Sequence, residues 1–143
     1  MTHAIVYQTG ICPTAEALAS LYRSVGWGTS EPPELVRQAV ERSGWLATAW
    51  DEDRLVGLAR VLTDFVFVAY FQELLVHPAY QHQGVGKELL DLYDLAFGSF
   101  KSQVVVTEVE WVRTKFEKRG FHSEPAALSR LRPWSGLGVE AHS

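Results

Sequence analysis

The sequence predicts a mixed α/β (α+β) fold, and the order of its predicted elements is the main evidence. A short strand comes first, two helical segments and further β-prone runs follow, and a strand, a glycine loop, a helix and a strand come next. The last group, over 65–76, 84–97 and 103–109, forms a βαβ unit, whose two strands must be parallel because a crossover helix connects them. We expect about four helices and a mostly antiparallel sheet of six to seven strands that contains this parallel pair.

The helical segments are recognised by apolar residues spaced three and four apart. In 14–27, Thr14 can cap the first turn, and Gly26 stands where the helix would end. The segment 31–45 begins with prolines, which are favoured at the start of a helix. A last helix is expected over about 110–120.

The strands are recognised by β-branched and aromatic residues between turn signals. The run 65–76 is almost continuously apolar, which is typical of a central strand that is covered on both faces. The chain is expected to return to strand structure from Phe121 on. The expected strands are 4–7, 45–50, 54–62, 65–76, 103–109 and 127–134.

The composition is that of one soluble globular domain. The 143 residues can bury a core without disulfides or metals, and 47% of them are apolar and 21% charged. We therefore expect a single domain over 1–143, with a frayed tail from about residue 135. The formal net charge of −4 gives no indication of a nucleic-acid or anionic-membrane partner, so neither is expected.

Cysteine and histidine usage excludes several kinds of site. Cys12 is the only cysteine, so no internal disulfide and no thiolate metal cluster can form, which favours a reducing interior. His77 and His82 have no carboxylate or cysteine cluster nearby, so no metal site is expected. The N-terminus lacks the pattern of a signal peptide and no apolar run approaches membrane-spanning length, so a cytoplasmic location is expected.

The segment 81–87, QHQGVGK, is the strongest motif, and two familiar anion-binding loops do not fit it. A Walker A loop needs a glycine five positions before its Gly-Lys pair and a Ser or Thr after the lysine, where this chain has Gln81 and Glu88. A dinucleotide-binding loop needs a third small residue, where this chain has Leu89. A third pattern, Q/R-x-x-G-x-G/A, fits at every defined position.

On this pattern the chain resembles the GNAT superfamily of acyl-CoA-dependent N-acetyltransferases, in its small bacterial single-domain form. The resemblance extends to the strand 56–64, the strand end and loop 74–81, and the closing segment 115–121, and by element order it covers about 4–133. It implies acetyl-CoA as the acyl-donor cosubstrate and a primary amine of a small molecule or peptide as the acceptor. Dimers are common in the family, so a homodimer is among the expected states.

The residues of the loop suit a bulky anion such as the pyrophosphate of CoA. Glycines at 84 and 86 let the backbone approach the anion without interference from Cβ, and the following helix adds unpaired N–H groups and the positive end of its dipole. Lys87 either contacts a phosphate or is a solvated lysine on the first helical turn, and both interpretations stay open. The expected pyrophosphate-binding residues are Gln81, His82, Gln83, Gly84, Val85, Gly86 and Lys87.

The family resemblance also implies a place for the pantetheine arm of CoA. In the family, the strand before the loop separates from its parallel neighbour, and its backbone pairs with the pantetheine amides as an added strand would. In this chain that strand ends at Leu74, Leu75 and Val76, whose side chains alone would indicate only a core strand. The N–H of Val76 is then expected to polarise the thioester carbonyl.

The resemblance leaves the proton transfers open. Glu73 is the only acidic residue in 65–76 and is the first candidate for the base, although pairing with a basic residue or capping of a bulge explains it equally well. Tyr70, on the opposite strand face by period-two counting, is more simply a packing residue. In many family members a tyrosine at the position of Phe116 uses its hydroxyl group to protonate or stabilise the thiolate of CoA. Phe116 can contact the cofactor but has no proton to donate. Tyr80, water or the dipole field of the helix could assist the departure of the thiolate instead.

The predicted function is N-acetyltransferase, with direct attack of the amine on acetyl-CoA in a ternary complex. The alternative, made credible by the absence of a hydroxyl at Phe116, is a non-catalytic acyl-CoA-binding or interaction module on the same fold. The first two helices and the loop between them are expected to set acceptor specificity. Aromatic residues that could line an acceptor pocket, or equally belong to the core, are Tyr22, Trp27, Trp45 and Trp50.

Overall fold

The computed structural model describes residues 4–27, 31–123 and 127–130, and the chain forms two compact units, Met1–Val106 and Thr107–Ser143. The described strands, all in the first unit, are β1 (Val6–Thr9), β2 (Trp45–Asp51), β3 (Arg54–Thr63), β4 (Val68–Val76) and β5 (Ser102–Val105). The helices of the first unit are α1 (Ala15–Ser24), α2 (Pro33–Glu41), the short 3-10 helix η1 (Pro78–Tyr80) and α3 (Val85–Phe97). The described helix of the second unit is α4 (Glu110–Glu117).

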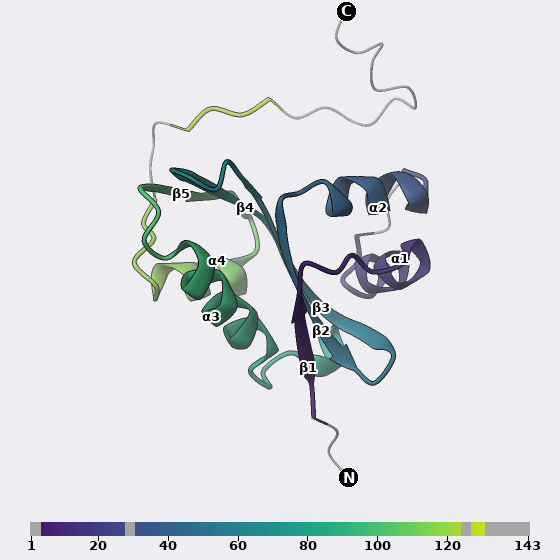
Figure 1. Ribbon diagram of the computed structural model, residues 1–143. Coiled ribbons are helices and arrows are strands. Elements are labelled where there is room, and N and C mark those ends of the chain that lie inside the picture. Colours follow the sequence, from purple (N-terminus) through teal and green to yellow (C-terminus); the bar gives the residue numbers. More distant parts are fainter. Residues whose placement is uncertain (1–3, 28–30, 124–126, 131–143) are drawn as a thin grey trace, which may run out of the picture. The chain divides into compact units, whose positions relative to one another are not determined.

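The strands form one sheet in the order β1-β2-β3-β4-β5 (Figure 1). Strands β1 to β4 pair antiparallel with their neighbours, whereas β4 and β5 are parallel because α3 connects them. The mixed α/β fold, its one parallel pair and the four α-helices of the described residues confirm the predicted fold class.

The strand count is lower than predicted, because the described residues contain five strands rather than six or seven. Residues 121–123 and 127–130 lie outside any strand, and Leu128 is almost fully exposed, so no pairing supports a strand there. The rest of the expected last strand, 131–134, and the tail from about 135 lie outside the described residues.

Local sequence signals start the first two helices where they are expected. The Thr14 hydroxyl oxygen accepts a hydrogen bond from the Ala17 N–H at 3.2 Å and so caps α1. Pro33 occupies the first position of α2, where an N–H would have no intrahelical acceptor. In Figure 1, α1 and α2 lie on one side of the sheet and α3 lies on the other.

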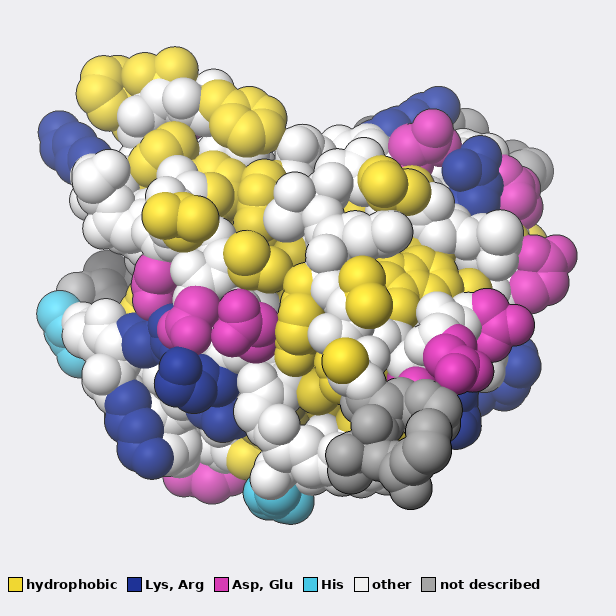
Figure 2. All heavy atoms as spheres, turned by 60° about the horizontal axis from the view of Figure 1, so that its bottom comes forward, with side chains coloured by type: hydrophobic (Ala, Val, Ile, Leu, Met, Phe, Trp, Pro, Cys, Tyr) yellow, Lys and Arg dark blue, Asp and Glu magenta, His cyan; other side chains and the backbone are white. Residues whose placement is uncertain are grey.

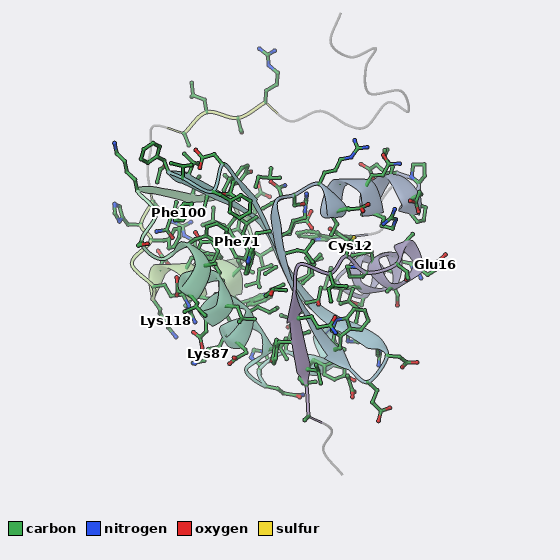
Figure 3. The ribbon with its side chains drawn as sticks, viewed as in Figure 1. Cys12, Glu16, Phe71, Lys87, Phe100 and Lys118 are labelled. Carbon is green, nitrogen blue, oxygen red and sulfur yellow. The ribbon has the colours of Figure 1, made fainter. Side chains whose placement is uncertain are left out.

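The two sides of the sheet have different cores. On the α3 side, the ring of Phe71, labelled in Figure 3, meets Tyr93 edge-on with centroids 5.0 Å apart. Trp45 meets Phe97 edge-on with centroids 5.5 Å apart. Trp45 therefore belongs to this aromatic core and not to an acceptor pocket near α1. The core on the α1 and α2 side consists of Leu18, Leu21, Tyr22, Val40, Leu46, Leu55, Leu58 and Leu75.

The turn between β3 and β4 shortens the predicted central strand. One carboxylate oxygen of Asp64 accepts hydrogen bonds from the N–H groups of Val66, Phe67 and Val68 at 2.8, 2.9 and 3.0 Å. These three donors hold the pKa of Asp64 below its ordinary value. Phe65 has a φ of 59°, so the chain turns there, and β4 begins only at Val68. The turn residues are exposed, which contradicts the expectation of cover on both faces over all of 65–76.

A β-bulge in β4 corrects the predicted orientation of Tyr70. Arg60 on β3 is opposite Glu73, but the next residue of β3 is opposite Phe71, so Gln72 is an extra residue in β4. Leu62 is opposite Tyr70. Because Arg60 and Leu62 are two residues apart on β3, their partners Glu73 and Tyr70 share one face of the sheet. Counting by alternation placed them on opposite faces, and the bulge is the reason that this prediction is wrong.

Candidate cofactor and active site

Strands β4 and β5 pair over only part of their length. Their ladder runs from Val68 opposite Ser102 to Phe71 opposite Val105, and β5 ends there. Strand β4 continues to Val76 and over this stretch pairs only with β3 among the described strands. The edge of β4 that faces away from β3 therefore pairs with no described strand over residues 72–76.

The backbone groups on that edge follow from the pairing with β3. The His77 N–H donates to the Val56 carbonyl at 2.8 Å, so His77 points its backbone groups toward β3. N–H groups alternate along a strand, so the N–H groups of Leu74 and Val76 point to the opposite edge. This edge offers backbone donors to an extended ligand, which is how sheets bind added peptide-like chains.

The loop after β4 is tied back to the strand by side chains. The side-chain amide of Gln81 donates to the Val76 carbonyl at 3.1 Å, and that of Gln83 donates to the Ala79 carbonyl at 3.0 Å. The two predicted ligands thus use their amide groups within the loop, which leaves their backbone groups for a bound anion. His82 has a φ of 63°, so the loop backbone is held in a conformation that few side chains favour.

The N-terminus of α3 has the features of an anion site. Gly84 is the N-cap residue with a φ of 88°, no side chain caps the helix, and a Cβ built on Gly84 would meet no atom within 4 Å. The Glu88 N–H donates to the Gly84 carbonyl at 3.0 Å, and the N–H groups of Val85 and Gly86, which precede it in the first turn, have no acceptor four residues back in the helix. The helix dipole adds positive potential at the same point.

Lys87 lies on the first turn of α3 (Figure 3), and its ammonium group is 2.9 Å from the Asp91 carboxylate. Both side chains are exposed, and pairs of this i, i+4 kind contribute about 0.3–0.5 kcal/mol at most. So weak an interaction does not prevent Lys87 from turning to a phosphate, and its predicted role stays open.

Gly57 on β3 allows α3 to approach the sheet. A Cβ at this position would lie 3.0 Å from Val85 Cγ1, 3.1 Å from Ala49 Cβ and 3.1 Å from Leu89 Cδ1. The Val85 and Leu89 side chains belong to the first turns of α3, and Ala49 is fixed in β2. The absence of a side chain at Gly57 therefore allows the first turns of α3, which carry the candidate anion site, to pack closely against the sheet.

The substitution Gly57→Ala is expected to destabilise the protein by about 1–3 kcal/mol, because the added methyl group overpacks the contact between β3 and α3. We expect a lower midpoint in urea unfolding and weaker CoA binding, since the first turn of α3 must shift. The double variant with Ala49→Gly, which removes one of the close atoms, should recover part of the CoA affinity. Unchanged stability in the single variant would contradict the close contact.

Glu73 lies at the centre of a largely buried polar network. One carboxylate oxygen is 3.0 Å from an Arg60 guanidinium nitrogen, and the other accepts a hydrogen bond from the Tyr22 hydroxyl. A second guanidinium nitrogen of Arg60 donates to the Ser43 hydroxyl at 3.1 Å. The Arg60 Nε is buried and finds no partner among the described residues. The network joins α1, β3 and β4 on the face that also carries Tyr70.

The environment of Tyr22 makes stability sensitive to alkaline pH. Burial and then the charge of Glu73 raise the pKa of Tyr22 well above its ordinary value of about 10. Above about pH 10 the unfolded chain loses this proton while the folded chain keeps it, so rising pH favours unfolding. The contribution of Tyr22 to the free energy of unfolding is fully present below about pH 10, and above it this free energy falls by up to about 1.4 kcal/mol per pH unit. In urea unfolding between about pH 9 and 11.5, the free energy of unfolding should therefore fall less steeply with pH in Tyr22→Phe than in the wild-type protein. Identical slopes against pH would contradict this.

Tyr80, a candidate proton donor, already has a partner. Its hydroxyl donates to the Asp51 carboxylate, and this hydrogen bond is the first cause of a raised pKa for Tyr80. The Arg54 guanidinium lies over the Tyr80 ring, 5.8 Å from its centroid, and is 2.8 Å from the His77 Nε2. Burial, and then the charge of Arg54, lower the pKa of His77. The cluster links the β2–β3 turn to the end of β4.

Phe116 belongs to α4 in the second unit. Its ring packs edge-on against Phe121, with centroids 5.0 Å apart and planes at 77°. The Phe121 N–H also donates to the Phe116 carbonyl at 3.2 Å, so the end of α4 is tied to the residue after Gly120. The phenyl group has no proton to donate, and its predicted contact with a cofactor stays a prediction.

Two kinds of site are absent from the part of the chain that the structure describes. No group of three or more His, Cys, Asp or Glu side chains there is arranged to hold a metal ion. None of the described helices is long and apolar enough to cross a membrane.

The mixed sheet, whose parallel pairing ends at Phe71, and the glycine loop at the N-terminus of α3 form the arrangement expected of the class of acyl-CoA-dependent acyltransferases. Residues 13–121 match the model of the acetyltransferase (GNAT) family, and the chain belongs to this family. A solved GNAT family acetyltransferase from Streptococcus pneumoniae is 25% identical, with a TM-score of 0.75 over 90% of this chain and 98% of that one. The solved aminoglycoside N-acetyltransferase AAC(6′)-Iy in complex with CoA, 15% identical, shares the fold with a TM-score of 0.67 over 92% and 97%.

The similarity to curated relatives is partial. An uncharacterised N-acetyltransferase of Prochlorococcus marinus is 38% identical over 77 residues, which are 51% of this chain and 42% of that protein. A histone acetyltransferase of Glycine max is 44% identical over 41 residues, 29% of this chain and 18% of that protein. The chain thus spans less than half the length of these relatives.

Proposed function

We propose that this protein is an N-acetyltransferase that transfers an acetyl group from acetyl-CoA to a primary amine of a small molecule or peptide, by direct attack in a ternary complex. The observation that carries the proposal is the uncapped N-terminus of α3 at Gly84, next to the edge of β4 that has no strand partner. Together they offer one site for a diphosphate and one for an extended amide chain, the two parts of CoA that need backbone partners.

The fit of the loop to a pyrophosphate rests on open space and backbone donors. Apart from its chain neighbours, no described residue lies within 4 Å of where a Gly84 Cβ would be, and the N–H groups of Val85 and Gly86 point out of the helix end. We assign the pyrophosphate to the backbone of residues 81–87 and the side chain of Lys87 to a phosphate oxygen. Gln81 and Gln83 then act as internal braces of the loop.

Residues 74–76 would hold the pantetheine arm through backbone groups. The N–H groups of Leu74 and Val76 face the free edge of β4, while Leu75 points its backbone toward β3. Bound acetyl-CoA supplies the acetyl group as a thioester. In the proposal the Val76 N–H donates to the acyl oxygen, where a preorganised donor stabilises developing negative charge.

Glu73 is the proposed base, acting on the amine directly or through water. The carboxylate is fixed by donors on both oxygens, from Tyr22 and Arg60, so it presents a constant position and a negative charge to an acceptor. A bound ammonium group must lose a proton before it can react, and a carboxylate of fixed geometry can accept one. Tyr22 and Arg60 are positioning residues in this proposal.

The departing thiolate needs a proton or a stabilising group, and Phe116 supplies neither. Tyr80 can do so only if its hydroxyl leaves Asp51. Water is the alternative, and a thiol of pKa about 8.5 is a fair leaving group near neutral pH. A non-catalytic CoA-binding module is the second candidate function, and the lack of a hydroxyl group on Phe116 is the feature that favours it.

Two measurements on the same protein test the proposed function. Isothermal titration with CoA is expected to show binding, and a thiol-release assay with acetyl-CoA is expected to show turnover with some members of an amine panel. Binding with no thiol release for any amine would support the non-catalytic module. Absence of CoA binding would overturn both candidates.

A further inference from the structure

Hydrophobic side chains reach the surface in several places, as on the face drawn in Figure 2, and one group of them lies on the sheet beside Glu73. Leu62, Tyr70 and Val104 are directly opposite one another on β3, β4 and β5, so their side chains share a face. Val68 is two residues from Tyr70 on the same face. Leu62 is 39% exposed, Val68 40% and Val104 43%. We call these four residues the apolar sheet end.

The helices of the first unit cover only the other end of this face. Tyr22 of α1 contacts Glu73, and Arg60 contacts Ser43 after α2, so the helices lie over the level of the Arg60–Glu73 pair. Beyond this pair, toward Leu62, no described helix of the first unit is shown to contact the sheet face, and its apolar side chains are exposed there. An exposed apolar area of this kind is a common feature of binding sites.

The turn beside the apolar sheet end is rigid. Asp64 accepts three backbone N–H groups, and the Thr63 hydroxyl donates to the Val68 carbonyl at 2.7 Å. The left-handed φ of 59° at Phe65 costs about 1–3 kcal/mol and is maintained by these hydrogen bonds. The surface is thus preorganised, which reduces the entropy lost when a ligand binds.

We propose that the apolar sheet end binds the apolar body of the acceptor, so that the acceptor is a monoamine with a hydrocarbon or aromatic part, its amino group next to Glu73. This proposal rests on the proposed acetyltransferase function. Glu73 and Tyr70 share the face opposite Arg60 and Leu62, which are two residues apart on β3, so at about 3.3 Å per residue they are separated by about 7 Å. The amine and the apolar part of the acceptor would be separated by a similar distance.

The charges on this face favour one positive group and disfavour a second. The Glu73 carboxylate can attract one ammonium group, while the Arg60 guanidinium repels a further cation. Leu62, Val68 and Val104 offer no charge or side-chain hydrogen bond to a second ammonium group, which would lose its water without compensation. Diamines, polyamines and aminoglycosides are therefore expected to be poor acceptors.

A series of matched amines tests the substrate class. From ethylamine to hexylamine, kcat/KM in the thiol-release assay should rise by up to about fourfold for each methylene group that is buried. 1,5-Diaminopentane, similar in length to hexylamine but with a second charge, should be at least about tenfold worse than hexylamine. Equal kcat/KM along the series, or a preference for the diamine, would overturn the proposal while leaving the acetyltransferase function intact.

Variants test whether the preference for longer amines arises at the apolar sheet end. Leu62→Ser and Val104→Ser should raise KM for hexylamine several-fold and leave KM for ethylamine and the affinity for CoA unchanged. Leu95→Ser, on α3, changes a leucine that is 86% exposed and should leave all three values unchanged. If all variants behave alike, the apolar sheet end does not hold the acceptor.

A binding measurement keeps the test valid if no amine gives turnover. Hexylamine added to the CoA-saturated protein should shift the methyl resonances of Leu62, Val68 and Val104 in ¹H–¹³C spectra, and 1,5-diaminopentane should not. Unshifted resonances would overturn the proposal. A dimeric mass in sedimentation equilibrium that Leu62→Ser converts to monomer would also overturn it, because a second copy would then cover this face.

Discussion

The variant Gly84→Asp is expected to lose CoA binding by at least about 100-fold while its thermal unfolding stays nearly unchanged. The carboxylate would lie among the N–H groups at the start of α3 and would repel the pyrophosphate that these donors are proposed to bind. Two charge-assisted hydrogen bonds, each worth roughly 1.5–3 kcal/mol, account for a loss of this size. Apart from the chain neighbours, no described residue lies within 4 Å of the new Cβ, and aspartate is one of the residues that takes a positive φ with the least strain, so the loss of stability should be small. Isothermal titration and differential scanning calorimetry measure the two effects.

Two further variants separate charge from backbone strain. Gly84→Asn has nearly the same shape and the same left-handed φ of 88° but no charge, so it should weaken CoA binding much less than aspartate does. Gly10→Asp places a carboxylate at another glycine with positive φ and open space, far along the chain from the loop, and should not change CoA affinity. Unaltered affinity in Gly84→Asp would rule out the pyrophosphate site.

The order of elements and the position of the glycine loop before α3 could be predicted because local signals specify them. Thr14 caps α1, Pro33 starts α2, and glycine at 84 takes a backbone conformation that most residues avoid. Apolar periodicity identified α3 and the strands around it. Such features depend on residues a few positions apart, which a single sequence displays directly.

The geometry around Glu73 could not be predicted, because it depends on pairing between distant segments. The bulge at Gln72 has no local sequence signal, and it moves Tyr70 to the face of Glu73. The partners Tyr22 and Arg60 come from α1 and β3, and only the folded sheet brings them to one carboxylate. The length of the turn after Asp64 was missed for a related reason, since the apolar residues from 65 on looked like part of a continuous strand, whereas β4 begins at Val68.

The variant Glu73→Gln is expected to lower kcat by about 10²- to 10⁴-fold without changing CoA affinity, if the carboxylate is the base. The amide is nearly the same size, so the position of β4 is kept, but it cannot accept a proton from the amine. Folding stability should also fall, because a largely buried guanidinium loses its ionic partner. Steady-state thiol release, CoA titration and urea unfolding separate the three effects.

The matched control is Arg60→Met, which removes the other member of the ion pair and leaves the carboxylate in place. If Glu73 only holds β3 and β4 together, Arg60→Met and Glu73→Gln should lower stability and kcat in parallel. If Glu73 is the base, Arg60→Met should keep substantially more activity than Glu73→Gln at a comparable loss of stability, because a proton acceptor is still present. Equal activities in the two variants would therefore assign Glu73 a structural role and leave water as the base.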